Sequence, residues 1–183
     1  MEDTAGKGIT ASELKELRRV FDYLADYVPK KKIYKQLNPL LERRQKLNQA
    51  KKASFDTKIQ DAKGNLMTEE QIDTEIQELS VQIDQFQAQI DVYDNAANRK
   101  VHAKDLSGAL LSLGKKCSKK EIEDLIWEVD ENLDGCVDWE EFKLMFQRNI
   151  SDTTGLEPFQ LFNVVQFMMY DKDNSGNVTV DET

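Results

Sequence analysis

The sequence predicts an all-α fold, in which an antiparallel helical hairpin, a coiled coil, precedes a region of helix–loop–helix units. The 183 residues include only three prolines and eight glycines, which favours long regular elements. Apolar residues recur at spacings of three and four along much of the chain, which is the period of one helix face. Two acidic stretches near the C-terminus follow helical segments and supply the loops of the helix–loop–helix units.

The composition excludes several classes of protein. A net charge of -9 argues against nucleic acid as a partner. No apolar run approaches the roughly 18 residues that span a bilayer, and the first ten residues lack the apolar core of a secretory signal. Two cysteines are too few for a disulfide scaffold, and a single histidine disfavours a catalytic triad or a histidine-rich zinc site. We therefore expect a non-secreted protein that is not an enzyme and has no catalytic residues.

The first predicted element is a helix within residues 1–29. Thr10 and Glu13 have the spacing of a capping box, which starts a helix near residue 11. Pro29 should end this helix, because a proline disfavours helical geometry in the residue before it. Between these signals the apolar residues follow one helix face: Leu14, Leu17, Phe21, Leu24 and Val28.

Residues 30–89 form the predicted hairpin, because a basic block is followed by an acidic one. Residues 30–63 carry a net charge of +8, and residues 64–98 carry -8. These opposite charges would select the pairing of two helices. The acidic segment has apolar residues at alternating spacings of four and three, the pattern of a coiled coil: Ile72, Ile76, Leu79, Ile83, Phe86, Ile90 and Tyr93. This seam could instead pair with another protein.

Three local signals shape the hairpin. Pro39 should break or kink the first of its helices, because it lacks a backbone N–H group. The Lys-Gly-Asn sequence at residues 63–65 is typical of a turn. Thr68 and Gln71 have capping-box spacing, so the second helix should start directly after Thr68.

The strongest motif is the stretch Asp130–Glu141. Oxygen-bearing side chains occupy alternating early positions, and Gly135 stands at the sixth position, where the loop must turn sharply. Calcium is a hard ion that takes about six to eight oxygen ligands, and a glutamate at the last position can close the shell with both oxygens. The predicted ligands are Asp130, Asn132, Asp134, the backbone carbonyl of Cys136, Asp138 and Glu141.

A second stretch, Asp171–Glu182, has the same pattern. Calcium is the expected ion at both loops, with magnesium as the alternative. The sequence ends at Thr183, so the helix that should follow this loop is missing, and we expect a weakened site. The predicted ligands are Asp171, Asp173, Ser175, the backbone carbonyl of Asn177, Thr179 and Glu182.

A degenerate loop precedes these two. When Val101 is aligned with the eighth loop position, Asp94 takes the first position and Asp105 the last. The third position is then alanine, which has no side-chain oxygen, and Arg99 replaces the glycine of the sixth. We expect that this loop keeps the fold and has lost the metal. His102 is interpreted as an exposed loop residue and not as a ligand.

Residues 90–183 resemble the calmodulin, centrin and troponin-C superfamily of EF-hand proteins, most closely from Leu106 to Phe146. The resemblance implies EF-hands that pair into lobes, bind calcium and often present an apolar groove to a target helix. The expected domains are therefore an N-terminal helix (1–29), the basic and acidic hairpin (30–89), an EF-hand pair whose first hand is degenerate (90–149) and a third hand without its exiting helix (150–183).

These features favour a calcium-binding adaptor or sensor that anchors to a larger assembly through its hairpin. Protein partners are expected at the hairpin and at an EF-hand groove. The architecture also resembles cytoskeletal and axonemal EF-hand subunits, so the first alternative is a structural subunit whose EF-hands serve as packing modules. The second is a membrane-associated regulator using the basic segment, although a membrane partner is disfavoured. The expected location is cytoplasmic, with the cytoskeleton or the axoneme as alternatives.

Overall fold

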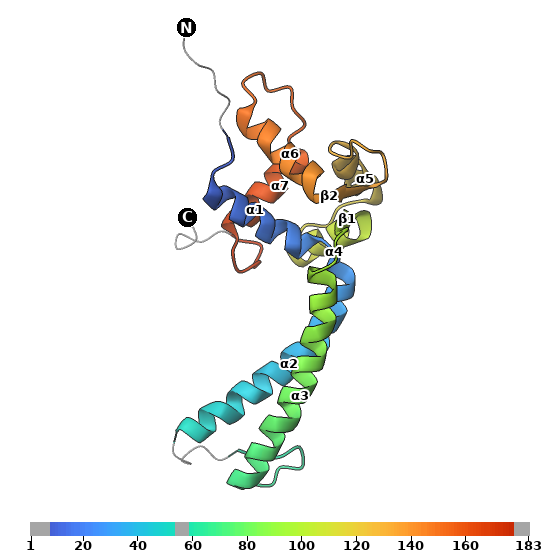
Figure 1. Cartoon of the computed structure of the whole chain (residues 1–183). Coiled ribbons are helices and arrows are strands. Elements are labelled where there is room, and N and C mark those ends of the chain that lie inside the picture. The colour runs from blue at the N-terminus through green and yellow to red at the C-terminus, as the bar shows by residue number, and fades with distance from the viewer. Residues whose placement is uncertain (1–7, 54–58, 178–183) are drawn as a thin grey trace. The chain divides into compact units, whose positions relative to one another are not determined.

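A computed structural model of the chain describes residues 8–53 and 59–177, shown in Figure 1. About 66% of the described residues are helical, and they form seven helices and one two-stranded sheet. This confirms the all-α prediction. The chain divides into two units: one contains the described residues up to Val28 and from Ala96 onward, and the other runs from Pro29 to Asn95.

The second unit is a helical hairpin, built from most of α2 (Tyr27–Lys52) and from α3 (Glu69–Asp94). Apolar residues from both helices form one buried cluster, in which Leu37 and Leu47 of α2 pack with Ile83 and Ile90 of α3. Ion pairs join the helices in antiparallel order, because partners early in α2 contact residues late in α3: Lys30 with Asp94, Arg43 with Glu75, and Lys51 with Asp73.

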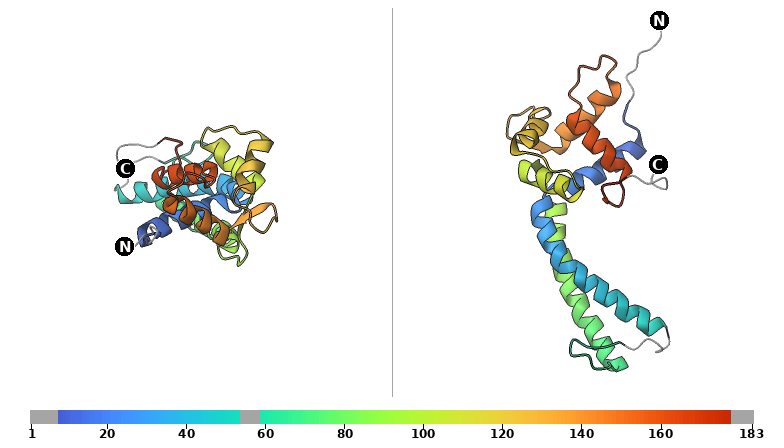
Figure 2. Two further views of the ribbon diagram at one scale, coloured as in Figure 1. Left: turned by 90° about the horizontal axis from the view of Figure 1, so that it is seen from above. Right: turned by 180° about the vertical axis from the view of Figure 1, so that it is seen from behind.

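The start of α3 and the turn before it follow the predictions. Thr68 accepts a hydrogen bond from the backbone N–H of Gln71, whose side chain in turn accepts one from Thr68. Gly64 has a φ of 84°, which suits the predicted turn. Pro39 was predicted to break or kink this helix: α2 is not broken but continues through Pro39, and Figure 2 shows that the helix changes direction along its length.

The first unit contains the remaining helices and the sheet. In chain order these are α1 (Ala11–Leu24), β1 (Lys100–His102), α4 (Ala103–Ser112), α5 (Lys119–Trp127), β2 (Cys136–Asp138), α6 (Trp139–Ser151) and α7 (Gln160–Tyr170). Capping boxes start α1 at Thr10 and α5 at Ser118. The helices therefore begin where side chains satisfy their unpaired first amides.

Helix α1 supplies a large part of the core of this unit. Leu17, Val20, Phe21 and Leu24 are all fully buried, and they pack with apolar residues of α4, α5, α6 and α7. The Phe21 ring centroid lies 5.4 Å from that of Trp139 and 5.3 Å from that of Phe142. The amphipathic pattern of α1 was evident from the sequence, but the surface against which it packs was not.

The junction between α1 and α2 differs from the prediction. Helix α1 ends at Leu24, and α2 begins at Tyr27, so the prediction that Pro29 ends the first helix at Val28 is wrong. The break falls at Ala25 and Asp26, where Asp26 has a φ of 58°. Pro29 lies in the first turn of α2, where its missing N–H group costs no helical hydrogen bond.

Helix α7 packs into the core mainly through its aliphatic residues. Leu161, Val165 and Met168 are buried, whereas Phe159 and Tyr170 are about half exposed. Over residues 8–53 and 59–177, none of the helices combines the length and the apolar character needed to cross a membrane.

Candidate metal site

The two strands pair the degenerate loop with the loop Asp130–Glu141. Strands β1 and β2 are antiparallel, with Val101 opposite Val137 and both side chains buried. These valines hold the eighth position of their loops, so the register is the one that the sequence alignment predicts. The strand pair therefore holds the second half of the degenerate loop against the second half of the loop Asp130–Glu141.

The first half of the loop Asp130–Glu141 is organised by its own polar side chains. The carboxylate of Asp130 accepts hydrogen bonds from the backbone N–H groups of Asp134, at 3.1 Å, and Gly135, at 2.8 Å. The Asn132 side-chain oxygen also accepts from Asp134 N–H, at 3.0 Å. Leu133 and Gly135 have φ values of 59° and 79°. The left-handed backbone turns the loop amides toward the carboxylates.

The second half of the loop is closed by Glu141. One of its carboxylate oxygens accepts from the backbone N–H groups of Glu131, at 3.1 Å, and Asn132, at 3.2 Å. The other accepts from Asp138 N–H, at 3.0 Å, and the Asp138 side chain accepts from Glu141 N–H in return. Asp138 and Glu141 thus form a capping box that starts α6. The first and last loop positions, Asp130 and Glu141, are both only 7% exposed.

This donor set fits a hard divalent cation. The side chains at the proposed ligand positions offer only carboxylate and amide oxygens, and the two buried carboxylates gain from a neighbouring positive charge. Across the described residues, no three histidine, cysteine, aspartate or glutamate side chains already converge as a metal cage. The loop carboxylates accept from backbone amides instead, so cation binding would exchange some of these hydrogen bonds for metal ligation.

Lys100 of β1 adds a positive charge to this loop. Its ammonium group forms an ion pair with the Asp134 carboxylate. Hydrogen bonding from Lys100 lowers the pKa of Asp134, and the same bond raises the pKa of Lys100. The sequence prediction of ligands did not include Lys100, because its side chain carries no oxygen and it lies in the degenerate loop.

The thiol of Cys136 lies beside an imidazole. Its sulfur is 2.9 Å from Nδ1 of His102, which is opposite it in the strand register. Burial raises the pKa of the Cys136 thiol, and the nearby Asp134 carboxylate adds to this effect. The thiol therefore stays protonated at neutral pH, which suits the prediction that only the backbone carbonyl of Cys136 serves as a ligand.

The second loop repeats the same hydrogen-bonded frame. The Asp171 carboxylate accepts from the N–H groups of Ser175 and Gly176, both at 2.9 Å, and Asp173 accepts from Ser175 N–H at 2.9 Å. Asn174 and Gly176 have φ values of 55° and 83°, matching the fourth and sixth positions of the first loop. Thr179 and Glu182 lie outside the described residues.

The Ser175 hydroxyl links the middle of this second loop. It donates to the backbone carbonyl of Asn177, the predicted ligand, at 3.0 Å. Hydrogen bonding from Ser175, first from its side chain and then from its backbone, lowers the pKa of Asp173. The Asp171 side chain is fully buried. The first five positions of the predicted site are therefore arranged as in the loop Asp130–Glu141.

The degenerate loop uses its polar residues for other contacts. Asp94 belongs to the hairpin unit, where it accepts from the Lys30 ammonium group at 3.2 Å. Arg99 is buried, and its guanidinium group forms an ion pair with the Asp22 carboxylate and donates to the Asp22 backbone carbonyl at 3.1 Å. A fixed cation at the sixth position thus connects this loop to α1. An arginine in place of glycine was the only sequence signal of this contact.

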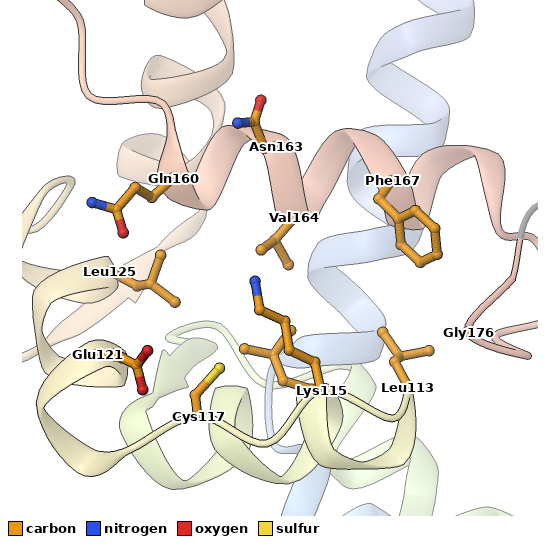
Figure 3. A pocket seen from close by; sticks show the side chains of 11 residues that line it. Leu113, Lys115, Cys117, Glu121, Leu125, Gln160, Asn163, Val164, Phe167 and Gly176 are labelled. Atoms are coloured by element: carbon orange, nitrogen blue, oxygen red, sulfur yellow. The ribbon is translucent and has the colours of Figure 1, made fainter.

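A cavity of about 480 Å³ opens between the α4–α5 connection and α7, as Figure 3 shows. Its apolar walls include Leu113, Leu125, Val164 and Phe167. Polar atoms at its rim come from Lys115, Glu121, Gln160 and Asn163, and the Cys117 thiol also faces it. None of the described methionines lines it, and Met145 and Met168 are buried in the core instead.

Comparison with known proteins agrees with this geometry. Residues 100–149 match the family described as an EF-hand domain pair. A probable calcium-binding protein of Arabidopsis thaliana, CML23, is 42% identical over 59 residues, which cover 32% of this chain and 38% of that protein. A probable calcium-binding protein of Oryza sativa subsp. japonica, CML16, is 38% identical over 73 residues, which cover 40% of each.

The chain spans about two fifths of the length of these curated relatives. The family match covers the part of the chain that carries the paired strands and the loop Asp130–Glu141. Residues 100–149 form an EF-hand pair and belong to the EF-hand superfamily.

Proposed function

We propose that this protein is a calcium-binding, non-enzymatic adaptor, whose calcium site is the loop Asp130–Glu141. The observation that carries this proposal is the conformation of the loop. Its first and last side chains, Asp130 and Glu141, are buried and accept hydrogen bonds from loop amides, and the backbone between them is left-handed at Leu133 and Gly135. The relatives CML23 and CML16 are described as probable calcium-binding proteins, which supports the same ion for this chain.

The residues that would hold the ion are those predicted from the sequence. Asp130, Asn132, Asp134 and Asp138 would supply side-chain oxygens, the Cys136 carbonyl would supply a backbone oxygen, and Glu141 would supply two. A bound divalent cation would neutralise the loop carboxylates and tie the start of α6 to the end of α5. Magnesium is a weaker candidate, because it demands a stricter octahedral arrangement than a loop of this kind offers.

The hairpin is the proposed anchor to a larger assembly. Its apolar seam is buried between α2 and α3, so the seam itself is already used within the chain. What it offers to a partner is its outer surface, where Lys32, Lys35 and Lys46 of α2 are exposed. Such a surface complements an acidic protein partner, and its contribution would weaken with added salt. The proposed location is the cytoplasm, including its filament systems.

A structural subunit is the second candidate function. It is favoured by α1, whose four buried apolar side chains fill the core between the EF-hand helices and leave little room for a calcium-driven opening. In an adaptor that senses calcium, the cavity beside α7 would widen on binding and receive an apolar segment of the partner. In a structural subunit, calcium would only stabilise the closed arrangement.

Tryptophan fluorescence tests the proposal, because Trp139 directly follows the ligand Asp138 and packs on Phe21. Trp127 is 72% exposed, so a Trp127→Phe background isolates the signal of Trp139. We expect the fluorescence of Trp139 to change saturably when calcium is added in millimolar-range magnesium. This change should be lost in Glu141→Gln and retained in Glu140→Gln, which alters the exposed neighbouring residue. A calcium-dependent rise in binding of an apolar dye would favour the sensor over the structural subunit.

A further inference from the structure

Lys100 links the degenerate hand to the metal loop of its partner. It begins β1, and its backbone lies opposite Asp138 in the strand pair. Its ammonium group reaches the carboxylate of Asp134, the fifth position of the loop. The two side chains are each about one third exposed, so the ion pair lies at the mouth of the loop and not in bulk solvent.

The pairing of β1 with β2 brings Lys100 and Asp134 together. The antiparallel register with β2 holds the backbone of Lys100 beside the second half of the metal loop. The Lys100 side chain is therefore held near two of the proposed ligands, Asp134 and Asp138, by the fold of the chain itself.

We propose that Lys100 is a tethered cation that competes with calcium for Asp134 and so lowers the calcium affinity of the loop. This inference rests on the proposed function of the loop as a calcium site. A bound ion must either displace the ammonium group from Asp134 or share the carboxylate with it. Displacing the ammonium group lowers the calcium affinity because the ion pair is lost, and sharing the carboxylate lowers it because the ammonium group then lies close to a divalent cation.

The degenerate hand would thereby set the calcium affinity of the second hand through one side chain. It supplies the paired strand that supports the metal loop, and it also supplies the charge that weakens it. Because both partners of the ion pair are partly exposed, solvent screens the effect to a moderate size. Replacing Lys100 by a neutral residue should tighten calcium binding by about three- to tenfold.

Calorimetric calcium titration of the full chain tests this. Lys100→Gln should bind about three- to tenfold more tightly, whereas Lys104→Gln, an equal loss of charge at an exposed position on α4, should leave the affinity within about twofold. In an Asp134→Asn background, the gain from Lys100→Gln should shrink, because the ion pair is already gone. Equal or weaker binding by Lys100→Gln would overturn the proposal.

Thermal unfolding gives a second readout. Without calcium, Lys100→Gln should unfold at the same temperature as the parent chain or slightly below it, because it has lost an ion pair. With calcium, its rise in unfolding temperature should exceed that of the parent chain. Lys100→Arg keeps the charge and should behave like the parent chain in both conditions, so a gain in calcium affinity in this variant as well would contradict the tethered-cation account.

The outcomes separate this inference from the proposed function. If the parent chain and Lys100→Gln bind calcium equally, and Glu141→Gln removes this binding from both, the loop Asp130–Glu141 is a calcium site and the tethered cation is refuted. If only Lys100→Gln binds, the tethered cation is supported, and the native chain is not a calcium binder under those conditions. If neither binds, both proposals fail.

Discussion

The side-chain oxygen Oδ1 of Asp105 accepts a hydrogen bond of 2.9 Å from the backbone N–H of Val28. Asp105 holds the last position of the degenerate loop, where an EF-hand carries its closing acidic ligand. Here the carboxylate is only 1% exposed and lies at the N-terminus of α2, where it satisfies one of the unpaired amides of the first turn. A ligand position has become a helix cap.

Removing this cap should destabilise the protein. Asp105→Ala leaves the Val28 amide without its acceptor, and we expect a loss of about 1–2 kcal/mol in the free energy of unfolding, the usual range for a lost cap. Asp105→Asn keeps a side-chain oxygen and should lose less. Denaturant titration followed by circular dichroism measures both. Equal stability of Asp105→Ala and the parent chain would show that the carboxylate does not cap α2.

Arg99 should contribute to the stability of the folded chain, although it lies in a loop. Arg99→Gly restores the glycine of an intact EF-hand but leaves the Asp22 carboxylate without its buried partner. We expect a loss of about 1–3 kcal/mol in the free energy of unfolding, as for hydrogen bonds to charged groups. Arg18→Gln is the control, because Arg18 also pairs with Asp22 but is 42% exposed, and it should cost about 0–1 kcal/mol.

Calorimetry on the same variant tests the assignment of the degenerate loop. Arg99→Gly should bind no additional calcium, because the third loop position is still Ala96 and Asp105 still caps α2. A further equivalent of bound calcium in this variant would mean that the arginine alone had blocked a functional site.

Helix α1 should be part of the folded EF-hand unit and not a detachable extension. Phe21 is fully buried between Trp139 and Phe142, so Phe21→Ala creates a cavity and should cost about 3–5 kcal/mol in the free energy of unfolding. Leu14 lies on the same helix but is 40% exposed, and Leu14→Ala should cost much less. Denaturation followed by Trp139 fluorescence compares them, and similar costs for both variants would contradict this packing.

Gly176 is constrained more tightly than Gly64. Both have a positive φ, but a side-chain carbon at residue 176 would lie 2.6 Å from the backbone carbonyl oxygen of Leu113. Alanine at residue 64 meets no atom within 4 Å. Gly64→Ala should therefore cost about 1–2 kcal/mol, the price of a left-handed residue alone, and Gly176→Ala should cost more. Thermal unfolding of the two variants tests this order.

Local signals in the sequence were sufficient for the helices and their starts. Thr10 and Thr68 each form the predicted capping box, because a box depends on residues three positions apart. The seam of α3 is buried over most of its length for a similar reason, since a helix face is set by short spacings. The prediction at Pro29 was wrong because the helix breaks earlier, at Ala25 and Asp26, and a new helix starts that has the proline in its first turn.

Contacts between distant segments were not accessible from the pattern. An apolar face on α1 predicts that something covers it, but gives no indication that the EF-hand helices do so. At the metal loop, the proposed ligands follow from the spacing within one loop. Lys100 is 34 residues from Asp134 in sequence, and only the strand register brings them together.

The central claim is calcium binding at the loop Asp130–Glu141, and calorimetric titration with calcium in millimolar-range magnesium tests it most directly. We predict a site of about micromolar affinity in the intact chain. This site should be lost in Glu141→Gln, where the closing carboxylate becomes an amide, and retained in Glu140→Gln. Heat of binding that is unchanged in Glu141→Gln, or absent from the intact chain, would contradict the account.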